Sequence, residues 1–345
     1  MNKLLTIVIP TYNMQAYLHR CLDSLLVSEE QMQQLEVLVI NDGSKDNSSA
    51  IAHEYEAKYP NTFRVIDKEN GNYGSCINRG LKEASGKYIK VLDADDWFDT
   101  TEFRKYLMQL QTVEVDLVLT AFNIVNADTM NRSLAYHPSL QTGKVYSLKD
   151  CTLEQVGVYM MHAVTYRTDL LRSIDYIQTT GISYTDTEWT YNPLYAVQNM
   201  VYFDSNVYQY FVGREGQTMD PKVMTRTISH HEIIARSLIE NDIAHPTQGF
   251  VHATIQRQIV YLLQKVYRTR LVLQDNASFN SNDMALFDSY IKAKRPDMYH
   301  KMGKLLLKPA LPIPYVVYWR IFGCRFPVDG IRNLYRHLRY GKFSD

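Results

Sequence analysis

Three aspartates lie within four positions of one another, at Asp93, Asp95 and Asp96, directly after the apolar stretch at residues 88–92. So much negative charge destabilises a folded chain unless a cation or a network of hydrogen-bond donors neutralises it. Hard divalent cations bind carboxylate oxygens together with phosphates, so the triplet is typical of a site that holds a metal ion and a phosphorylated substrate. An acidic turn that caps the following helix is the alternative, and the triplet alone does not decide between the two.

The elements that must position these aspartates alternate along the chain. Short stretches rich in β-branched and other apolar residues predict four buried strands, at residues 4–9, 36–40, 63–66 and 88–92. Apolar residues at helical spacing lie between them, and strands that alternate with helices form a parallel sheet through right-handed crossovers. We therefore expect Thr11, Asp42 and the pair Asp93 and Asp95 to surround one crevice at the carboxyl edge, where such folds bind ligands.

The usual phosphate-binding loops are absent from the sequence. A dinucleotide-binding fold carries G-x-G-x-x-G after its first strand, whereas Pro10-Thr11-Tyr12-Asn13 stands at that place here. No G-x-x-x-x-G-K-[ST] loop occurs anywhere in the chain. A bound nucleotide would therefore depend on polar loop residues and on a carboxylate–metal site.

Three blocks carry a resemblance to a known family. They are Ile7-Val8-Ile9-Pro10-Thr11-Tyr12-Asn13, Val39-Ile40-Asn41-Asp42-Gly43-Ser44, and Gly86-Lys87-Tyr88 through Leu92-Asp93-Ala94-Asp95-Asp96-Trp97. In this order, over roughly residues 4–100, they resemble the family 2 glycosyltransferases, which are inverting enzymes. The resemblance implies an α/β protein with the A-type glycosyltransferase fold. This fold has a mostly parallel, Rossmann-like sheet flanked by helices, and we expect a helical C-terminal extension.

The resemblance also implies roles for individual residues. Asp42 matches the carboxylate that hydrogen-bonds the uracil base, Asp93 the aspartate that faces the ribose, and Asp95 the ligand of Mn²⁺ or Mg²⁺. Further nucleotide contacts are implied at Pro10, Thr11, Tyr12, Asn13, Asn70 and Ala94. The chain departs from the family at Asn72, where a second Gly is common, and at Ile77, where an Arg is usual.

A later block, Gly181-Ile182-Ser183-Tyr184-Thr185-Asp186-Thr187-Glu188-Trp189, resembles the segment that carries the family's catalytic base. The match assigns the base to Asp186, although Thr185 stands where Glu is usual. We expect a helix from about Thr187, which leaves Asp186 facing the cleft and turns Glu188 elsewhere as a partner of the helix dipole. Arg214 matches a basic loop that contacts the donor's diphosphate; a solvated turn residue is the alternative.

These matches favour an enzyme that moves a sugar from a nucleotide sugar, UDP-linked by the resemblance, to an acceptor hydroxyl with inversion. The acceptor would be a saccharide or lipid-linked saccharide in bacterial surface polysaccharide or glycolipid assembly. No Gln-x-x-Arg-Trp block follows, which favours a single addition over polymerisation. A sugar-phosphate nucleotidyltransferase would carry a Gly-rich, basic loop after the first strand. Thr185 and Ile77 leave open a catalytically inactive, nucleotide-sugar-binding regulatory subunit.

The pattern suggests three regions: a nucleotide-sugar-binding half at residues 1–100, an acceptor-binding half at 101–225 and a helical extension at 226–345. The formal net charge of the chain is zero, which gives no support to nucleic-acid binding. Its four cysteines form no C-x-x-C pair, as in reduced intracellular proteins, and no stretch of about 18 apolar residues predicts a membrane span. We therefore expect a cytoplasmic protein.

The C-terminal segment differs from the rest in charge. Residues 292–345 carry twelve Lys and Arg against three Asp, a net charge of +9. An apolar face is predicted there at Ile331, Leu334, Tyr335 and Leu338. Basic residues beside apolar ones favour peripheral binding to an anionic membrane, here the inner face of the plasma membrane. Packing on the enzyme body, or on a second subunit in a homodimer, is the alternative.

Overall fold

The computed structural model describes residues 3–214, 217, 221–275, 277–307, 314–327 and 330. The chain divides into two compact units, and each is described by itself. The first comprises Met1–Thr218 with Ala244–Ile255, and the second comprises Met219–Ile243 with Gln256–Asp345. The predicted apolar face at residues 331–338 lies outside the described residues.

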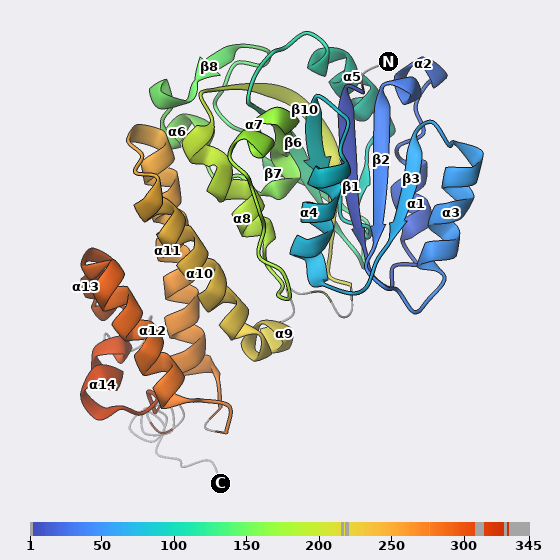
Figure 1. Ribbon diagram of the computed structural model, residues 1–345. Coiled ribbons are helices and arrows are strands. Elements are labelled where there is room, and N and C mark those ends of the chain that lie inside the picture. The colour runs from blue at the N-terminus through green and yellow to red at the C-terminus, as the bar shows by residue number, and fades with distance from the viewer. Residues whose placement is uncertain are drawn as a thin grey trace. The chain divides into compact units, whose positions relative to one another are not determined.

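The first unit is built on a ten-stranded sheet in which the predicted parallel strands lie side by side (Figure 1). Their order is β3-β2-β1-β4. The bounds are β1 (Leu5–Thr11), β2 (Leu35–Asn41), β3 (Phe63–Asp67) and β4 (Tyr88–Val91). All four were predicted, and all three pairings are parallel. Leu5, Ile7, Val8 and Ile9 are fully buried, as expected of a central strand covered on both faces.

Beyond β4 the sheet becomes mixed. The order continues β9-β6-β10-β5, with β7 paired to β6 and β8 to β10. The bounds are β5 (Trp97–Phe98), β6 (Leu117–Asn126), β7 (Arg132–Tyr136), β8 (Val145–Ser147), β9 (Val164–Arg167) and β10 (Asn199–Val212). Strand β9 runs antiparallel to both β4 and β6, whereas β10 runs parallel to β6. This mixed part carries the loops that complete the edge where the parallel strands end.

Short helices connect and cover these strands. They are α1 (Leu18–Asp23), α2 (Glu29–Gln33), α3 (Ser48–Lys58), α4 (Asn72–Glu83), α5 (Thr100–Leu110), α6 (Leu153–Val156), α7 (Thr168–Ser173) and α8 (Asp186–Tyr191), with 3₁₀ turns η1 (Leu148–Asp150), η2 (Met161–Ala163) and η3 (Asn192–Ala196). Local sequence explains where several of these helices begin. The side chain of Asp99 accepts hydrogen bonds from the first amides of α5, and Thr152 with Gln155 forms a capping box at α6.

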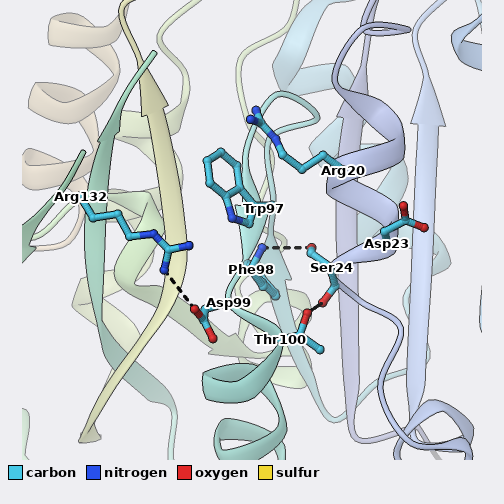
Figure 2. A pocket seen from close by; sticks show the side chains of 8 residues that line it. All are labelled: Arg20, Asp23, Ser24, Trp97, Phe98, Asp99, Thr100 and Arg132. Atoms are coloured by element: carbon cyan, nitrogen blue, oxygen red, sulfur yellow. Dashed lines mark hydrogen bonds and ion pairs between the residues drawn. The ribbon is translucent and has the colours of Figure 1, made fainter. Parts of the chain in front are cut away.

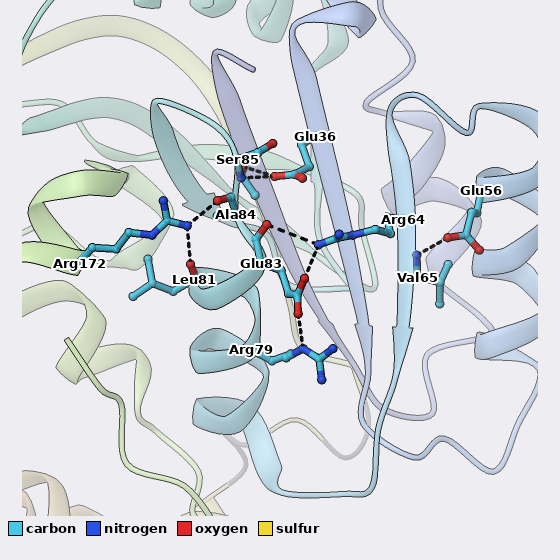
Figure 3. Close-up of polar contacts among 11 residues, drawn as sticks. Glu36, Glu56, Arg64, Val65, Arg79, Leu81, Glu83, Ala84, Ser85 and Arg172 are labelled. Carbon is cyan, nitrogen blue, oxygen red and sulfur yellow. Dashed lines mark hydrogen bonds and ion pairs between the residues drawn. The ribbon is translucent and has the colours of Figure 1, made fainter. Parts of the chain in front are cut away.

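Helix α4 lies close against β1 and β2. The approach requires Gly80, because a Cβ atom built there would lie 2.4 Å from Cγ1 of Val8. Figure 3 shows how the far end of the helix is held: Arg172 donates to the carbonyl oxygens of Leu81 (3.2 Å) and Ala84 (2.5 Å). An arginine at this position satisfies carbonyls that a helix end leaves unpaired.

The second unit is helical, as expected for the C-terminal part. It draws on α9 (Pro221–Arg226), α10 (Ile228–Ala244), α11 (Gly249–Arg268), the π-helical turn η4 (Thr269–Leu273), α12 (Ser281–Lys294), α13 (Pro296–Gly303) and α14 (Tyr315–Phe322). Enclosed ion pairs join its helices, with Arg320 Nη2 2.7 Å from Asp288 and Arg270 Nε 2.6 Å from Glu232. Among the described residues, no helix is both long and apolar enough to cross a membrane.

Candidate active site

The loops after β1, β2 and β4 meet at the carboxyl edge of the sheet, as the strand order predicts. Thr11 ends β1, Asp42 follows β2 directly, and the acidic loop follows β4. The first two loops are tied together, because the amide of Asn13 donates to Ser44 Oγ (3.0 Å) and Asn13 Oδ1 accepts from the amide of Lys45 (2.7 Å). Asn13 has a φ of 54°, a left-handed conformation that Asn tolerates.

The other predicted contacts of the nucleotide lie in the same loops. Pro10 is half-buried and precedes Thr11, which is only 1% exposed, while Tyr12 is 46% exposed at the tip. Asn70 reaches across from the loop after β3, and its Nδ2 donates to the carbonyl oxygen of Asp42 (2.9 Å). Ala94 is buried within the acidic loop. A ligand at this edge would therefore meet exposed Tyr12 beside the loop that carries Asp42.

Lys68 is a charged neighbour of Asp42 that the sequence analysis missed. It follows β3 directly and forms an ion pair with Asp42. The sequence contains a signal for it, because a residue after β3 must lie beside the residue after its neighbour β2. Ile77, which stands where the family usually has Arg, is fully buried and offers no charge. Lys68 is thus a cation that this chain does bring to the loop.

The acidic loop is held by tyrosines from distant segments. Tyr73 donates to Asp93 Oδ1 (2.8 Å), and Tyr208 donates to Asp96 Oδ2 (2.7 Å) while accepting from the amide of Asp93 (3.1 Å). Asp96 also accepts from the amide of Phe211 (2.7 Å). Burial, with the neighbouring charges of Asp95 and Asp93, raises the pKa of Asp96. Asp96 therefore joins the loop to β10.

Asp95 pairs with Arg214, and the distance from Asp95 Oδ2 to Arg214 Nε is 2.6 Å. A second arginine holds the backbone: Arg20 Nη2 donates to the carbonyl oxygen of Asp95 (2.8 Å). The guanidinium of Arg20 lies 3.9 Å from the ring centre of Trp97 and 4.3 Å from that of Phe211. Aromatic rings on this cation orient it without competing for its hydrogen bonds.

Arg20 and Trp97 also line an open depression of about 580 Å³ beside β5 (Figure 2). Asp99 and Arg132 face each other across it and form an ion pair of 3.1 Å. The residues that line the depression do not include Thr11, Asp42 or any of residues 93–96, so we assign it no ligand.

Three donor atoms suited to a divalent cation converge next to Asp95. Oxygens of Asp93 and Asp96 and a ring nitrogen of His162, which lies in η2, are all within 4.8 Å of one another. His162 is 3% exposed, and its Nδ1 has no hydrogen-bond partner among the described residues. Burial lowers the pKa of His162 to about 3, so the ring is neutral at pH 7, the form that binds metals. Carboxylate oxygens suit Mg²⁺ and Mn²⁺, whereas Asp95, the ligand expected from the sequence, is not one of these three residues.

Asp186 lies beside the acidic loop, as expected. Burial raises the pKa of Tyr73 first, and the negative charges of Asp93 and Asp186 raise it further. The same charge of Asp186 acts on the pKa of Asp93 and of Tyr210. Helix α8 begins at Asp186 itself, one residue earlier than predicted, so Asp186 occupies the first turn.

Glu188 lies in the first turn of α8, as predicted, and it has a second role there. Its side chain is buried, and its oxygens accept hydrogen bonds from Thr179 N (2.8 Å) and Thr179 Oγ1 (2.7 Å). Glu188 thus anchors the loop before α8. Thr185, which stands where the family usually has Glu, is fully buried, and its Oγ1 has no hydrogen-bond partner among the described residues.

Comparison with known sequences identifies the family. The model described as "Glycosyl transferase family 2" matches residues 6–175. The uncharacterized glycosyltransferase MG025 homolog of Mycoplasma pneumoniae is 30% identical over 217 residues, which cover 62% of this chain and 70% of the relative. The chain belongs to glycosyltransferase family 2.

Other relatives match over shorter segments. MG025 of Mycoplasma genitalium is 45% identical over 104 residues, 30% of this chain and 35% of that protein. The minor teichoic acid biosynthesis protein GgaB of Bacillus subtilis is 35% identical over 102 residues, 30% of this chain and 11% of that protein. The matched segments thus span about a third or less of these two relatives.

Solved structures identify the fold. Staphylococcus aureus TarS 1–349 in complex with UDP-GlcNAc superposes with a TM-score of 0.66 at 19% identity, covering 99% of this chain and 93% of that one. The mannosyltransferase PcManGT of Pyrobaculum calidifontis, in complex with GDP-Man and Mn²⁺, gives 0.51 at 13% identity, covering 87% and 83%. The first unit has the A-type glycosyltransferase fold that the sequence predicted.

Proposed function

We propose that the protein transfers a sugar from a UDP-linked donor to an acceptor hydroxyl with inversion. One observation carries the proposal: Asp42, the acidic loop and Asp186 come from three distant segments and gather at one edge of the sheet. A donor with a base, a diphosphate and a reactive sugar needs these groups together. The complex of TarS with UDP-GlcNAc supports a UDP-linked donor.

The donor would lie across the carboxyl edge. Asp42 hydrogen-bonds the base, with Pro10, Thr11, Tyr12, Asn13 and Asn70 around it. Asp93 and Ala94 face the ribose, and Arg214 contacts the diphosphate. Support comes from the placement of these residues on neighbouring loops and from the contact of Arg214 with Asp95 in the acidic loop.

We assign the divalent cation, Mn²⁺ or Mg²⁺, to Asp95, with Asp93, Asp96 and His162 as the neighbouring donors. When bound, it offsets the negative charge that grows on the departing nucleoside diphosphate. The Mn²⁺ in the PcManGT complex and the unpartnered Nδ1 of His162 support this assignment. The chain's own contribution is to hold the loop rigid through Tyr73, Tyr208 and Arg20.

Asp186 is the general base in this proposal. Its carboxylate takes the proton of the acceptor hydroxyl while that oxygen forms a bond to the anomeric carbon. The bond from that carbon to the diphosphate oxygen breaks on the opposite face, and the nucleoside diphosphate leaves with the bonding electrons. One displacement inverts the anomeric configuration. Glu188 is less suited, because both of its oxygens already hold Thr179.

The remaining assignments stay predictions. We propose a saccharide or lipid-linked saccharide as acceptor, in surface polysaccharide assembly. Support comes from the relative GgaB, whose name is minor teichoic acid biosynthesis protein. Residues 1–100 would bind the donor, 101–225 the acceptor, and 226–345 would form the helical extension.

Binding of the C-terminal segment to anionic membranes would be seen as co-flotation with anionic vesicles at low salt. Absence of co-flotation would favour packing of this segment on the enzyme or in a homodimer.

The proposal is tested by incubating the full chain with a panel of nucleotide sugars, an acceptor extract and Mn²⁺, and following nucleoside diphosphate release. Release from one UDP-sugar, dependent on acceptor and lost in Asp186→Asn, is the expected result. Calorimetric titration of UDP with Mn²⁺ and with excess chelator tests the metal. Equal affinity in both, or normal Mn²⁺-dependent binding by Asp95→Ala, would remove Asp95 as ligand. Binding of a nucleotide sugar without turnover would favour the inactive regulatory subunit.

A further inference from the structure

Lys68 reaches Asp42 because of the way β3 continues past its end. The amide of Lys68 donates to the carbonyl oxygen of Asn41 (3.0 Å), which extends the pairing of β2 and β3 by one residue. The side chains of Lys68 and Asp42 are 19% and 4% exposed, respectively. Water therefore screens this ion pair less than one at the surface.

The ammonium of Lys68 has no donor to spare for a ligand. An ammonium carries three N–H donors. Those of Lys68 have three acceptors: Asp42 Oδ1, the carbonyl oxygen of Glu69 (2.6 Å) and Ser75 Oγ (2.9 Å). Lys68 can therefore influence a bound nucleotide chiefly through Asp42, which makes it a positioning residue.

The carboxylate of Asp42 is oriented by two strong donors on the same oxygen. Oδ1 accepts from Lys68 Nζ and from the amide of Gly71 (2.9 Å). Cys76 is a further neighbour; burial and then the charge of Asp42 raise the pKa of its thiol to about 12, so it remains a weak, protonated donor. With Oδ1 fixed, the lone pairs of Oδ2 are left for a stronger donor from a ligand.

We propose that Lys68 sets the base preference of the donor site, by holding the carboxylate of Asp42 in one orientation. The inference rests on the proposed function, in which Asp42 faces the base. An ionised carboxylate can only accept, so it binds a base whose ring nitrogen carries hydrogen, such as N3–H of uracil. Cytosine presents a lone pair at N3 and is repelled. Specificity of this kind depends on the unfavourable contact with the wrong ligand as well as on the favourable one.

Loss of Lys68 should weaken this discrimination rather than binding alone. Without the ammonium, Oδ1 of Asp42 loses one of its two donors. The carboxylate can then turn away from the orientation that meets N3–H of uracil. Lys68→Met should therefore lose affinity for UDP while CDP loses little, whereas Lys68→Arg retains the cation.

The experiment measures calorimetric affinities of UDP and CDP in Mn²⁺ for the wild-type chain, Lys68→Met, Lys68→Arg and Asp42→Asn. Lys82→Met, an exposed lysine on α4, is the matched control. We expect wild type and Lys82→Met to prefer UDP, and Lys68→Met to reduce the ratio of UDP to CDP affinity by about tenfold, as for loss of a charge-assisted hydrogen bond. Lys68→Arg should retain most of the ratio, and thermal melts establish that each variant is folded.

Three outcomes would overturn the inference, and they differ in whether they also reject the proposed donor site. Equal losses of UDP and CDP in Lys68→Met would mean that Lys68 only supports the loop. If Lys68→Met keeps the wild-type preference for UDP over CDP while Asp42→Asn loses it, the role of Lys68 is rejected. The proposed donor site then remains. Equal binding of UDP and CDP by wild type and Asp42→Asn would remove Asp42 as the base contact, and the donor assignment with it.

Discussion

Arg214 and Asp95 are 119 positions apart in sequence and form a close ion pair, with Arg214 Nε 2.6 Å from Asp95 Oδ2. Their side chains are 17% and 12% exposed. The guanidinium also lies 5.3 Å from the ring centre of Tyr17. Two residues to which the sequence gave separate roles, diphosphate contact and metal ligand, thus form an ion pair with each other.

This pair predicts opposite effects of Arg214→Gln on metal and donor. Without the guanidinium, Asp95 should bind Mn²⁺ alone about tenfold more tightly, a change of ~1.4 kcal/mol. UDP in Mn²⁺ should bind less tightly, because a phosphate contact is lost. Calorimetry with each ligand measures both, and Arg132→Gln, which breaks the pair with Asp99, is the control. Unchanged Mn²⁺ affinity in Arg214→Gln would contradict the competition.

Asp186→Asn and Glu188→Gln should separate catalysis from stability. Loss of a general base typically lowers rate by ~10²–10⁴-fold, so Asp186→Asn should retain UDP binding and lose most transfer. Glu188→Gln places an amide nitrogen against the donors of Thr179, which should lower the free energy of unfolding by ~1–3 kcal/mol with little change in kcat. Initial rates and urea titrations measure the two effects. The reverse pattern would move the base to Glu188.

Gly80→Ala should destabilise the protein through the contact of α4 with β1. The new methyl would lie 2.4 Å from Cγ1 of Val8, and overpacking of this kind costs ~1–3 kcal/mol. The free energy of unfolding from urea titration measures the loss. The double variant with Val8→Ala should be more stable than the sum of the two single changes predicts. Simple additivity would show that the helix moves away instead.

Lys90 should make stability depend on pH. It is fully buried in β4, donates to the carbonyl oxygens of His162 (2.8 Å) and Val164 (3.2 Å), and burial lowers its pKa to about 7. The unfolded chain, with the ordinary lysine pKa of 10.5, binds more protons above pH 7. The free energy of unfolding should therefore rise from pH 7 to 9.5, with up to ~1.4 kcal/mol per pH unit from this residue.

Denaturation of wild type, Lys90→Met and Lys82→Met at several pH values checks this expectation. Lys90→Met should show a shallower rise with pH, while Lys82→Met, on the surface, should follow wild type. A variant slope equal to that of wild type would assign the dependence to other groups. Lys90→Met also leaves two carbonyls unpaired, so its stability at pH 9.5 should be lower.

The sequence by itself determined the parallel half of the sheet and the edge at which Thr11, Asp42 and the acidic loop meet. Strand and helix patterns are local, and the crossover rule then makes the strands parallel, with their carboxyl ends at one edge, without any knowledge of side-chain contacts. The family motifs lie in the same segments, and the match to the family 2 model confirms the family that they predicted. Asp186 beside the acidic loop was likewise expected, although only the motif, and no local pattern, carried that expectation.

Tertiary structure alone decided which charges neutralise which. The antiparallel insertion of β9 brings His162 next to Asp93 and Asp96, and β10 brings Tyr208 to the same loop. Arg214 pairs with Asp95, and Glu188 turns inward to Thr179. Most of these partners are separated by tens of residues in sequence. Glu188 and Thr179 are nine positions apart, and they meet because both pack inward, not because of helical spacing. Because the energy of a charge depends on its distance to other charges and to water, no spacing along the chain could have predicted them.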